Sequence, residues 1–265
     1  GGNTAIYMRA GSLQTLFVTD SEIYNYDMVI HYYSPRDAVL VVLYRCTLAG
    51  NNRIVKLVNG YRRLNINLDV SKCSISQTRY NGFDINVDQF AVKLSFNNNT
   101  FFKNEGTLLR VWRRFSDNSR STIRIDRNVF VNNILSPRYA LIDFFGKGVG
   151  TIFTNICKNS FTENKCSFLV KVDIRSNRLG PKYLSFNNNV LEDNEGIHDV
   201  KSYSLGLLGC ISKQFNIQYN VFDNELMEKE LFLGQTCGSN YLSKNFYIDA
   251  TLNYWGKSST KNLRE

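Results

Sequence analysis

One five-slot pattern recurs along the chain and constrains the possible folds more than any other feature of the sequence. In each unit, two apolar residues two positions apart precede an Asn, a further apolar residue and a second polar residue; the unit at 94–104 is the clearest. The first polar slot is occupied in turn by Ser21, Cys46, Cys73, Asn99, Asn128, Asn159, Asn189, Asn220 and Asn253. Successive slots are 25 to 33 residues apart, so the chain contains nine units of one architecture.

The spacing inside each unit indicates short strands separated by corners. Residues two apart share one face of a strand, whereas the Asn three positions later changes face unless the chain bends there. A second alternating apolar run follows in most units, as at 108–112 and 168–172. No segment has the spacing of an amphipathic helix. The sequence therefore predicts an all-β fold, a right-handed parallel β-helix of about nine coils, with residues 1–265 as one domain and the repeat anchors at 16–256.

The same slots predict the interior of this β-helix. We expect one inward stack along the axis, in which neighbouring aromatic rings pack offset or edge to face. The members of this stack are Phe101, Phe130, Phe161, Leu191, Phe222 and Trp255. Asn tolerates the left-handed backbone of a corner, and stacked amides can hydrogen-bond along the axis. We expect a buried structural ladder, rather than a ligand groove, from Asn99, Asn128, Asn159, Asn189 and Asn220.

Composition favours an extracellular protein. Charged residues make up 21% of the chain and aromatic residues 13%, which excludes an intrinsically disordered chain. An even number of cysteines, six, and a glycosylation sequon at Asn98 favour an oxidising, secreted setting. The cysteines lack metal-binding spacing, so we expect neither a metal nor a cofactor. We interpret the chain as a fragment of a larger secreted or membrane-anchored ectodomain that does not itself contact the membrane.

The positions of the cysteines predict three disulfides. Cys46 and Cys73 occupy the same slot of consecutive units, so their Cα atoms should lie about 4.8 Å apart, within bridging range. Cys157 and Cys166 flank one corner, and Cys210 and Cys237 lie near the ends of comparable strands. We expect the pairs 46–73, 157–166 and 210–237.

The net charge of +9 makes an acidic glycan a possible partner. The best candidate patch for an acidic ligand comprises Arg110, Arg113, Arg114, Arg120, Arg124 and Arg127. Aligned by unit, however, the second strands carry charges that alternate in sign: Lys56, Asp84, Arg110, Asp143 and Lys171. Opposite charges on neighbouring strands stabilise each other. An alternating ladder is typical of a solvated face rather than of a polyanion track, so we expect no nucleic-acid partner.

Several segments resemble the pectin-lyase-like superfamily of right-handed parallel β-helices. The resemblance lies in 96–101, in 125–130 and in the final run 248–256, which is similar to the A-x-x-N-x-W-G ending of many such helices. It covers most of residues 16–256 and implies the fold more strongly than the function, since this fold hosts lyases, hydrolases, adhesins and non-enzymes. The ending also resembles the β-helix modules of the Bark beetle (Anakonda) family of tricellular-junction proteins, whose ectodomains also carry Cys-rich modules and precede one membrane span.

The resemblance provides few enzyme signatures. Lyases of this superfamily resemble one another in using clustered Asp residues for Ca²⁺ and a Lys or Arg base, and the related hydrolases carry an Asp-Asp pair, a His-Gly and an Arg-x-Lys. This sequence has none of the three hydrolase motifs, and its acidic residues are scattered. Asp143 and Asp173 fall on the second strands of adjacent coils and could approach one another, as two facing carboxylates must in glycoside hydrolysis.

These features favour a non-enzymatic extracellular module that serves cell adhesion or cell-junction organisation as a rigid protein-interaction scaffold. The partner would be another protein or a second copy of the chain. One alternative is a secreted polysaccharide lyase or glycoside hydrolase that acts on acidic glycans; another is a lectin-like binder without chemistry. Recognition should use loops that lengthen without disturbing the slots, at 115–121, 176–182 and 198–204.

Overall fold

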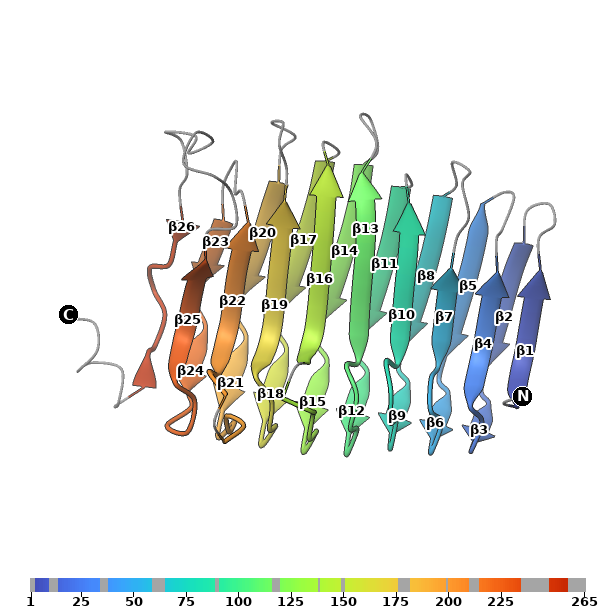
Figure 1. Ribbon diagram of the computed structural model, residues 1–265, viewed down its shortest axis with the longest axis horizontal. Helices are drawn as coiled ribbons and strands as arrows, with labels where there is room; N and C mark the ends of the chain where they lie inside the picture. The colour runs from blue at the N-terminus through green and yellow to red at the C-terminus, as the bar shows by residue number, and fades with distance from the viewer. Residues whose placement is uncertain are drawn as a thin grey trace.

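The computed structural model describes residues 3–9, 14–33, 38–58, 65–88, 91–115, 120–137, 139–148, 151–175, 182–198, 200–209, 215–234 and 248–256. Within these ranges the chain forms 26 short strands in three parallel sheets. The predicted all-β parallel β-helix is confirmed (Figure 1). Its right-handed winding and its total of about nine coils stay predictions.

The chain visits the three sheets in a fixed order, one strand of each per coil (Figure 1). Sheet A contains β1 (Thr4–Arg9), β4 (Met28–Tyr33), β7 (Val55–Val58), β10 (Phe83–Asp88), β13 (Leu109–Phe115), β16 (Ala140–Gly148), β19 (Phe168–Arg175), β22 (Tyr203–Gly209) and β25 (Lys229–Gly234). Sheet B contains β2 (Gln14–Thr19), β5 (Val39–Tyr44), β8 (Asn65–Ser71), β11 (Ala91–Asn97), β14 (Arg120–Asp126), β17 (Thr151–Cys157), β20 (Lys182–Asn187), β23 (Phe215–Gln218) and β26 (Ile248–Asp249). Sheet C contains β3 (Glu22–Tyr24), β6 (Thr47–Ala49), β9 (Ser74–Ser76), β12 (Thr100–Phe102), β15 (Val129–Val131), β18 (Ser160–Thr162), β21 (Val190–Glu192) and β24 (Val221–Asp223).

The corner between sheets B and C depends on a single left-handed residue. This residue comes immediately before the slot residue, with φ of 54° at Asn98, 56° at Arg127 and 57° at Lys158. The expectation that the slot Asn itself adopts this conformation is therefore wrong. The slot side chain must point inward to bond with neighbouring coils, so its exposed predecessor makes the bend, even where that residue is Arg or Lys.

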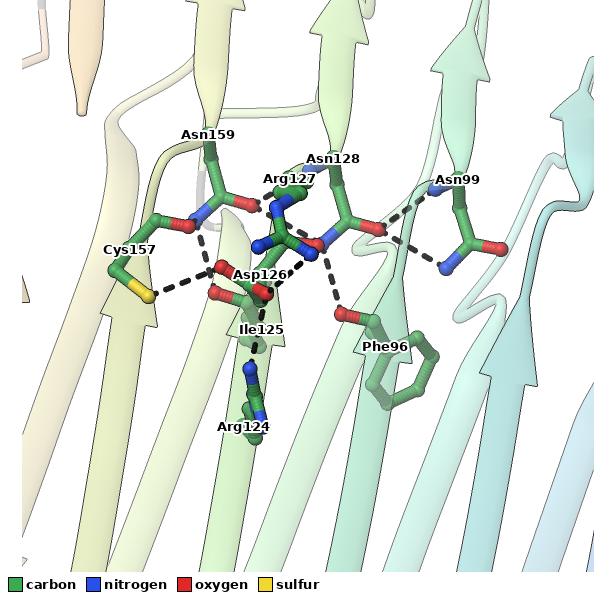
Figure 2. A network of polar contacts seen from close by, with 9 residues as sticks. All are labelled: Phe96, Asn99, Arg124, Ile125, Asp126, Arg127, Asn128, Cys157 and Asn159. Atoms are coloured by element: carbon green, nitrogen blue, oxygen red, sulfur yellow. Dashed lines mark hydrogen bonds and ion pairs between the residues drawn. The ribbon is translucent and has the colours of Figure 1, made fainter. Parts of the chain in front are cut away.

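The predicted Asn ladder is confirmed. In Figure 2, Asn128 Nδ2 donates to Asn159 Oδ1 at 3.0 Å and to the carbonyl of Phe96 in the preceding coil at 3.0 Å. The Asn128 backbone N–H donates to the same Asn159 oxygen at 2.9 Å. The pattern repeats from Asn99 to Asn253, and the five predicted ladder residues are all buried. These amides thus bond to each other and to backbone groups of the neighbouring coils.

A second ladder lies after sheet C and was not recognised as such in the sequence. Asn104, Asn133, Asn164 and Asn194 each donate Nδ2 to the Oδ1 of the next member, at 2.7 to 2.9 Å, and the last acceptor is Asn224. In the other coils this slot comes five residues after the first Asn, a spacing that would select Glu225, but in the last of these coils Asn224 comes only four residues after Asn220. The ladder ends at Glu230, whose carboxylate accepts from the Asn224 backbone N–H at 2.9 Å, from Asn224 Nδ2 at 3.0 Å and from the Ser204 hydroxyl.

The predicted inward stack is present in the expected register. Phe130 stacks on Phe101 and Phe161 with ring centroids 4.8 and 4.6 Å apart, and Leu191 pairs with Phe161 and Phe222 on the neighbouring strands. Trp255, only partly buried, stacks on Phe222 at 4.7 Å. The rings are almost parallel, with interplanar angles of 4 to 6°, rather than edge to face. In-register strands hold equivalent rotamers one strand spacing apart, which favours this geometry.

Candidate functional site

The outer face of sheet A carries the alternating charges in register. Asp84 pairs with Lys56 on one side and with Arg110 on the other, and Asp143 pairs with Arg110 and Lys171. We call these five residues the sheet A ladder. Strands β7, β10, β13, β16 and β19 present it in one row, so the Cα of each member lies one strand spacing, about 4.8 Å, from that of an oppositely charged neighbour. The predicted alternation along the axis is confirmed.

Asp143 is a ladder member whose pKa is shifted by its surroundings. Burial raises the pKa of its carboxyl, the charges of Lys171 and Arg110 act in the opposite direction, and the charge of Asp173 raises it further. Asp173 itself is only 5% exposed. It lies on β19 as the register partner of Phe145, and Asp143 is the register partner of Lys171. The two Asp residues are therefore diagonal neighbours, with Cα atoms about 8 Å apart from one strand spacing and a two-residue rise.

Aromatic rings accompany these charges on the same face. Trp112 is 40% exposed, lies 5.0 Å from the Phe145 ring, and has the Arg110 guanidinium 5.2 Å from its centroid. The Lys171 ammonium lies 5.8 Å from the Phe168 centroid. Cations over ring faces are favourable. The face thus combines both signs of charge with exposed aromatic surface, a composition suited to binding another molecule.

His31 and Tyr7 continue this row toward the N-terminal end of sheet A. Their rings meet edge to face at 5.3 Å, and His31 is the register partner of Lys56. Burial and the positive charges of Lys56 and Arg53 lower the pKa of His31. The neutral imidazole is therefore favoured here, so His31 contributes ring surface rather than charge at neutral pH.

Of the six Arg residues predicted to bind an acidic ligand, the four whose side chains are described do not form one patch. Arg110 lies in sheet A, whereas Arg120 and Arg124 lie on the exposed face of sheet B and Arg127 at the following corner. Arg113 and Arg114 belong to β13, but their side chains are outside the described part of the chain. These residues are close in the sequence, but the chain passes from sheet A to sheet B between Arg114 and Arg120, which places them on different faces of the coil.

Two of these Arg residues pair with a buried carboxylate. Figure 2 shows Asp126 between Arg124 and Arg127, with N–O distances of 3.1 and 3.6 Å to one carboxylate oxygen. The other oxygen accepts from the Cys157 thiol at 3.1 Å. Asp126 is almost fully buried, so these contacts compensate its desolvation. Arg124 and Arg127 are thereby partly committed to a structural contact.

The predicted disulfides 46–73 and 157–166 are wrong, because all four cysteines are free thiols. Cys46 and Cys73 occupy ladder slots, and their thiols point like the Asn amides to carbonyls of the preceding coil, Val18 at 3.3 Å and Leu43 at 3.5 Å. Burial raises the pKa of Cys73 to about 12.

Cys157 and Cys166 lie on opposite sides of the coil wall. Cys166 belongs to the interior, whereas Cys157 ends β17 on the outer side of sheet B. Burial, then the hydrogen bond to Asp126 and its charge, raise the pKa of Cys157 to about 11. A thiol reacts as thiolate, so Cys157 is weakly reactive near neutral pH. Cys210 and Cys237 lie outside the described residues.

The sequon and the predicted recognition loops have mixed outcomes. Asn98 lies at an exposed corner, where an oligosaccharide would meet solvent, and its glycosylation stays a prediction. Most of the loops 115–121 and 176–182 lies outside the described residues. The third, 198–204, is not an exposed loop throughout: β22 begins at Tyr203, and Ser202 and Ser204 are buried.

The outer face of sheet B holds a site that sequence reasoning missed. A surface hollow of about 290 Å³ lies over β14, β17, β20 and β23. The rings of Phe153 and Tyr183 line it, with centroids 4.8 Å apart and planes 6° from parallel. The signal was available in the sequence: Phe153 and Tyr183 each come one position before the first slot residue of their unit, so they occupy equivalent sites in consecutive coils.

Among the described residues, no three His, Cys, Asp or Glu side chains form a group able to hold a metal ion. In the same part of the chain, no helix combines the length and apolar character that crossing a membrane requires. Comparison with protein-family models, with curated proteins and with solved structures gives no match for this chain.

Proposed function

We propose that this chain is a rigid, non-enzymatic extracellular scaffold that binds protein in cell adhesion or cell-junction organisation. The observation that carries the proposal is the sheet A ladder, an in-register row of alternating charges accompanied by exposed Trp112. Such a row presents many evenly spaced polar and aromatic contacts to a partner surface. The likeness of the final run 248–256 to β-helix modules of the Bark beetle (Anakonda) family supports a junctional setting.

Rigidity is the second property that a scaffold needs. From the coil of Asn99 onward, both Asn ladders and the Phe stack connect successive coils through buried contacts. Bending the axis would lengthen hydrogen bonds on one side of the coil and compress the packed rings on the other. Neighbouring modules or partners would therefore be held at a fixed separation.

The charge order of the sheet A ladder also suits contact between two copies of the chain. The row reads plus, minus, plus, minus, plus. Two copies related by a two-fold axis that crosses the row between Arg110 and Asp143 place Arg110 of one copy opposite Asp143 of the other, and Asp84 opposite Lys171. A second copy is thus a candidate partner, and another protein with alternating charge is the other.

Bead aggregation tests this proposal. Beads coated with the chain, alone and mixed with cells, are compared with beads that carry Arg110→Glu, which breaks the alternation. Lys93→Glu, an exposed residue of sheet B with the same change in charge, is the matched control. We expect aggregation or cell attachment that Arg110→Glu reduces and Lys93→Glu preserves. Equal behaviour of both variants would mean that the sheet A ladder is not the contact surface.

One observation favours the enzymatic alternative, a lyase or glycoside hydrolase for acidic glycans. Asp143 has a raised pKa and lies beside Lys171 and diagonal to Asp173, an arrangement from which a general acid can arise. Polygalacturonate and glycosaminoglycans, each with and without Ca²⁺, are the substrates to test for new reducing or unsaturated ends. Turnover that Asp143→Asn abolishes would establish the alternative and refute the non-enzymatic proposal.

A further inference from the structure

The hollow on sheet B has a floor of short polar side chains and one aromatic wall. Asn155, Ser185 and Asn216 are register partners on β17, β20 and β23, so they form one row across three strands. Phe153 and Tyr183 lie two residues earlier on the first two of these strands and form the wall. Amide and hydroxyl groups supply both hydrogen-bond donors and acceptors along the row, which spans about 10 Å, or two strand spacings.

Positive charge is concentrated at the N-terminal side of this hollow. The Arg120 guanidinium lies over the Phe153 ring, 4.6 Å from its centroid, and Arg124 is the register partner of Asn155. Arg120 is exposed beside a ring that lines the hollow, and its guanidinium carries a planar fork of N–H donors. Such a fork matches a carboxylate or sulfate group in geometry and in charge.

We propose that this hollow, lined by Phe153, Tyr183, Asn155, Ser185 and Asn216 and flanked by Arg120, is a binding site for an acidic oligosaccharide. A sugar ring presents an apolar C–H face that packs on an aromatic ring, and an edge of hydroxyl groups that pairs with amides and hydroxyls. The row contributes one polar side chain from each strand, which suits a chain of sugars that runs across the strands, along the β-helix axis.

This site is independent of the proposed scaffold function. It lies on sheet B, whereas the sheet A ladder belongs to a different face of the coil. A protein surface could also cover these partly exposed rings, but it would not require stacked rings, a row of small polar side chains and a guanidinium over one ring to occur together. Carboxylated and sulfated saccharides share the chemistry that Arg120 recognises, so the test includes both.

Isothermal titration with three tetrasaccharides tests the proposal: tetragalacturonate, a sulfated κ-carrageenan tetrasaccharide, and neutral cellotetraose. We expect saturable binding of one of the two acidic probes, with cellotetraose weaker. Arg120→Gln should weaken that binding at least about tenfold, as expected for loss of a charged hydrogen-bond pair. Arg45→Gln is the matched control, since Arg45 also lies over a ring, that of Tyr44, and loses the same charge.

Two further variants keep the test independent of folding. Asn155→Asp is isosteric and places a negative charge on the floor, so it should also weaken binding of the acidic probe, whereas Asn67→Asp elsewhere on sheet B should not. Tyr183→Val removes half of the wall and should abolish binding with melting temperature retained. Absence of acidic binding, equal binding of cellotetraose, or indifference to both Arg120→Gln and Asn155→Asp would overturn the proposal. Bead aggregation is a separate readout that these variants should leave unchanged.

Discussion

Replacement of Asn159 by Leu tests whether the first ladder is structural. Asn159 Nδ2 donates to the carbonyls of Ile125 and Cys157 and to Asn189 Oδ1, each at 3.0 Å. Its Oδ1 accepts from the backbone N–H of Asn128 at 2.9 Å and from Asn128 Nδ2 at 3.0 Å. Leu has the same branched arrangement of side-chain heavy atoms and none of these groups, so the substitution removes every side-chain hydrogen bond at this position.

The size of the effect follows from the groups that lose a partner. The Asn128 N–H and the Ile125 carbonyl are buried beside the slot and would lose their contacts with Asn159. At about 1–3 kcal/mol for each unsatisfied buried group, Asn159→Leu should lower the free energy of unfolding by about 2–6 kcal/mol. For a chain of this size, the melting temperature should fall by on the order of 10 °C.

Thermal melting followed by circular dichroism and by tryptophan fluorescence measures this loss; two probes are needed because solenoids can unfold in parts. Asn65→Leu, at the exposed start of β8, is the matched control and should stay within about 0.5 kcal/mol of the wild type. Bead aggregation per folded molecule should be unchanged in both variants. A melting temperature within about 2 °C of the wild type, with binding abolished, would refute the structural role of Asn159 and favour a ligand groove.

Three more changes test the interior. Phe130→Ala removes the middle of the Phe101–Phe161 stack and should lower the free energy of unfolding in urea by about 3–5 kcal/mol. A loss as small as that expected for truncation of a solvent-exposed Phe would contradict the inward register. Thr78→Asn should raise stability by about 1 kcal/mol, because the Thr78 hydroxyl is buried without a partner at the equivalent slot one coil before Asn104, the first member of the second ladder; a lower melting temperature would exclude ladder extension. Burial raises the pKa of Glu230, so its contribution to stability is present at low pH and is lost as pH rises through the folded-state pKa. Glu230→Gln should therefore reduce the fall in melting temperature with rising pH across the acidic range. An unchanged pH dependence would count against this role.

Much of the fold was predictable because each coil repeats the same side-chain requirements. The apolar and Asn slots specify which residues face inward, and the strand period then determines the sheets, as the Phe130 stack and the Asn128 bonds illustrate. The left-handed position before each slot was not predictable from residue type, because Arg127 and Lys158 adopt it under the constraint of the inward Asn. The one-residue shortening that brings Asn224 into the second ladder was equally hidden, since it appears only as a hydrogen bond across coils.

The candidate sites were predictable only where they follow the same register. The alternation from Lys56 to Lys171 is visible because equivalent positions stack, and the diagonal approach of Asp143 and Asp173 follows for the same reason. The disulfide prediction failed because equal slots bring the Cys46 and Cys73 side chains near each other as free thiols, which donate to the carbonyls of Val18 and Leu43. The predicted Arg patch was wrong because residues close in the sequence are separated where the chain turns from sheet A to sheet B.

The Asn ladder has a consequence for how chains of this kind can change in length during evolution. Asn128 and Asn159 are 31 residues apart and make equivalent bonds, so loss of residues 129–159 would leave Asn128 directly facing Asn189 in the same geometry. Phe161 would likewise fall next to Phe101. A gene that gains or loses one such period therefore encodes a rod that is longer or shorter by one strand spacing, about 4.8 Å, with every internal contact type retained. Small-angle scattering of the deletion variant would measure the change in length. Selection can therefore adjust the distance between molecules bound at the two ends of the rod one coil at a time.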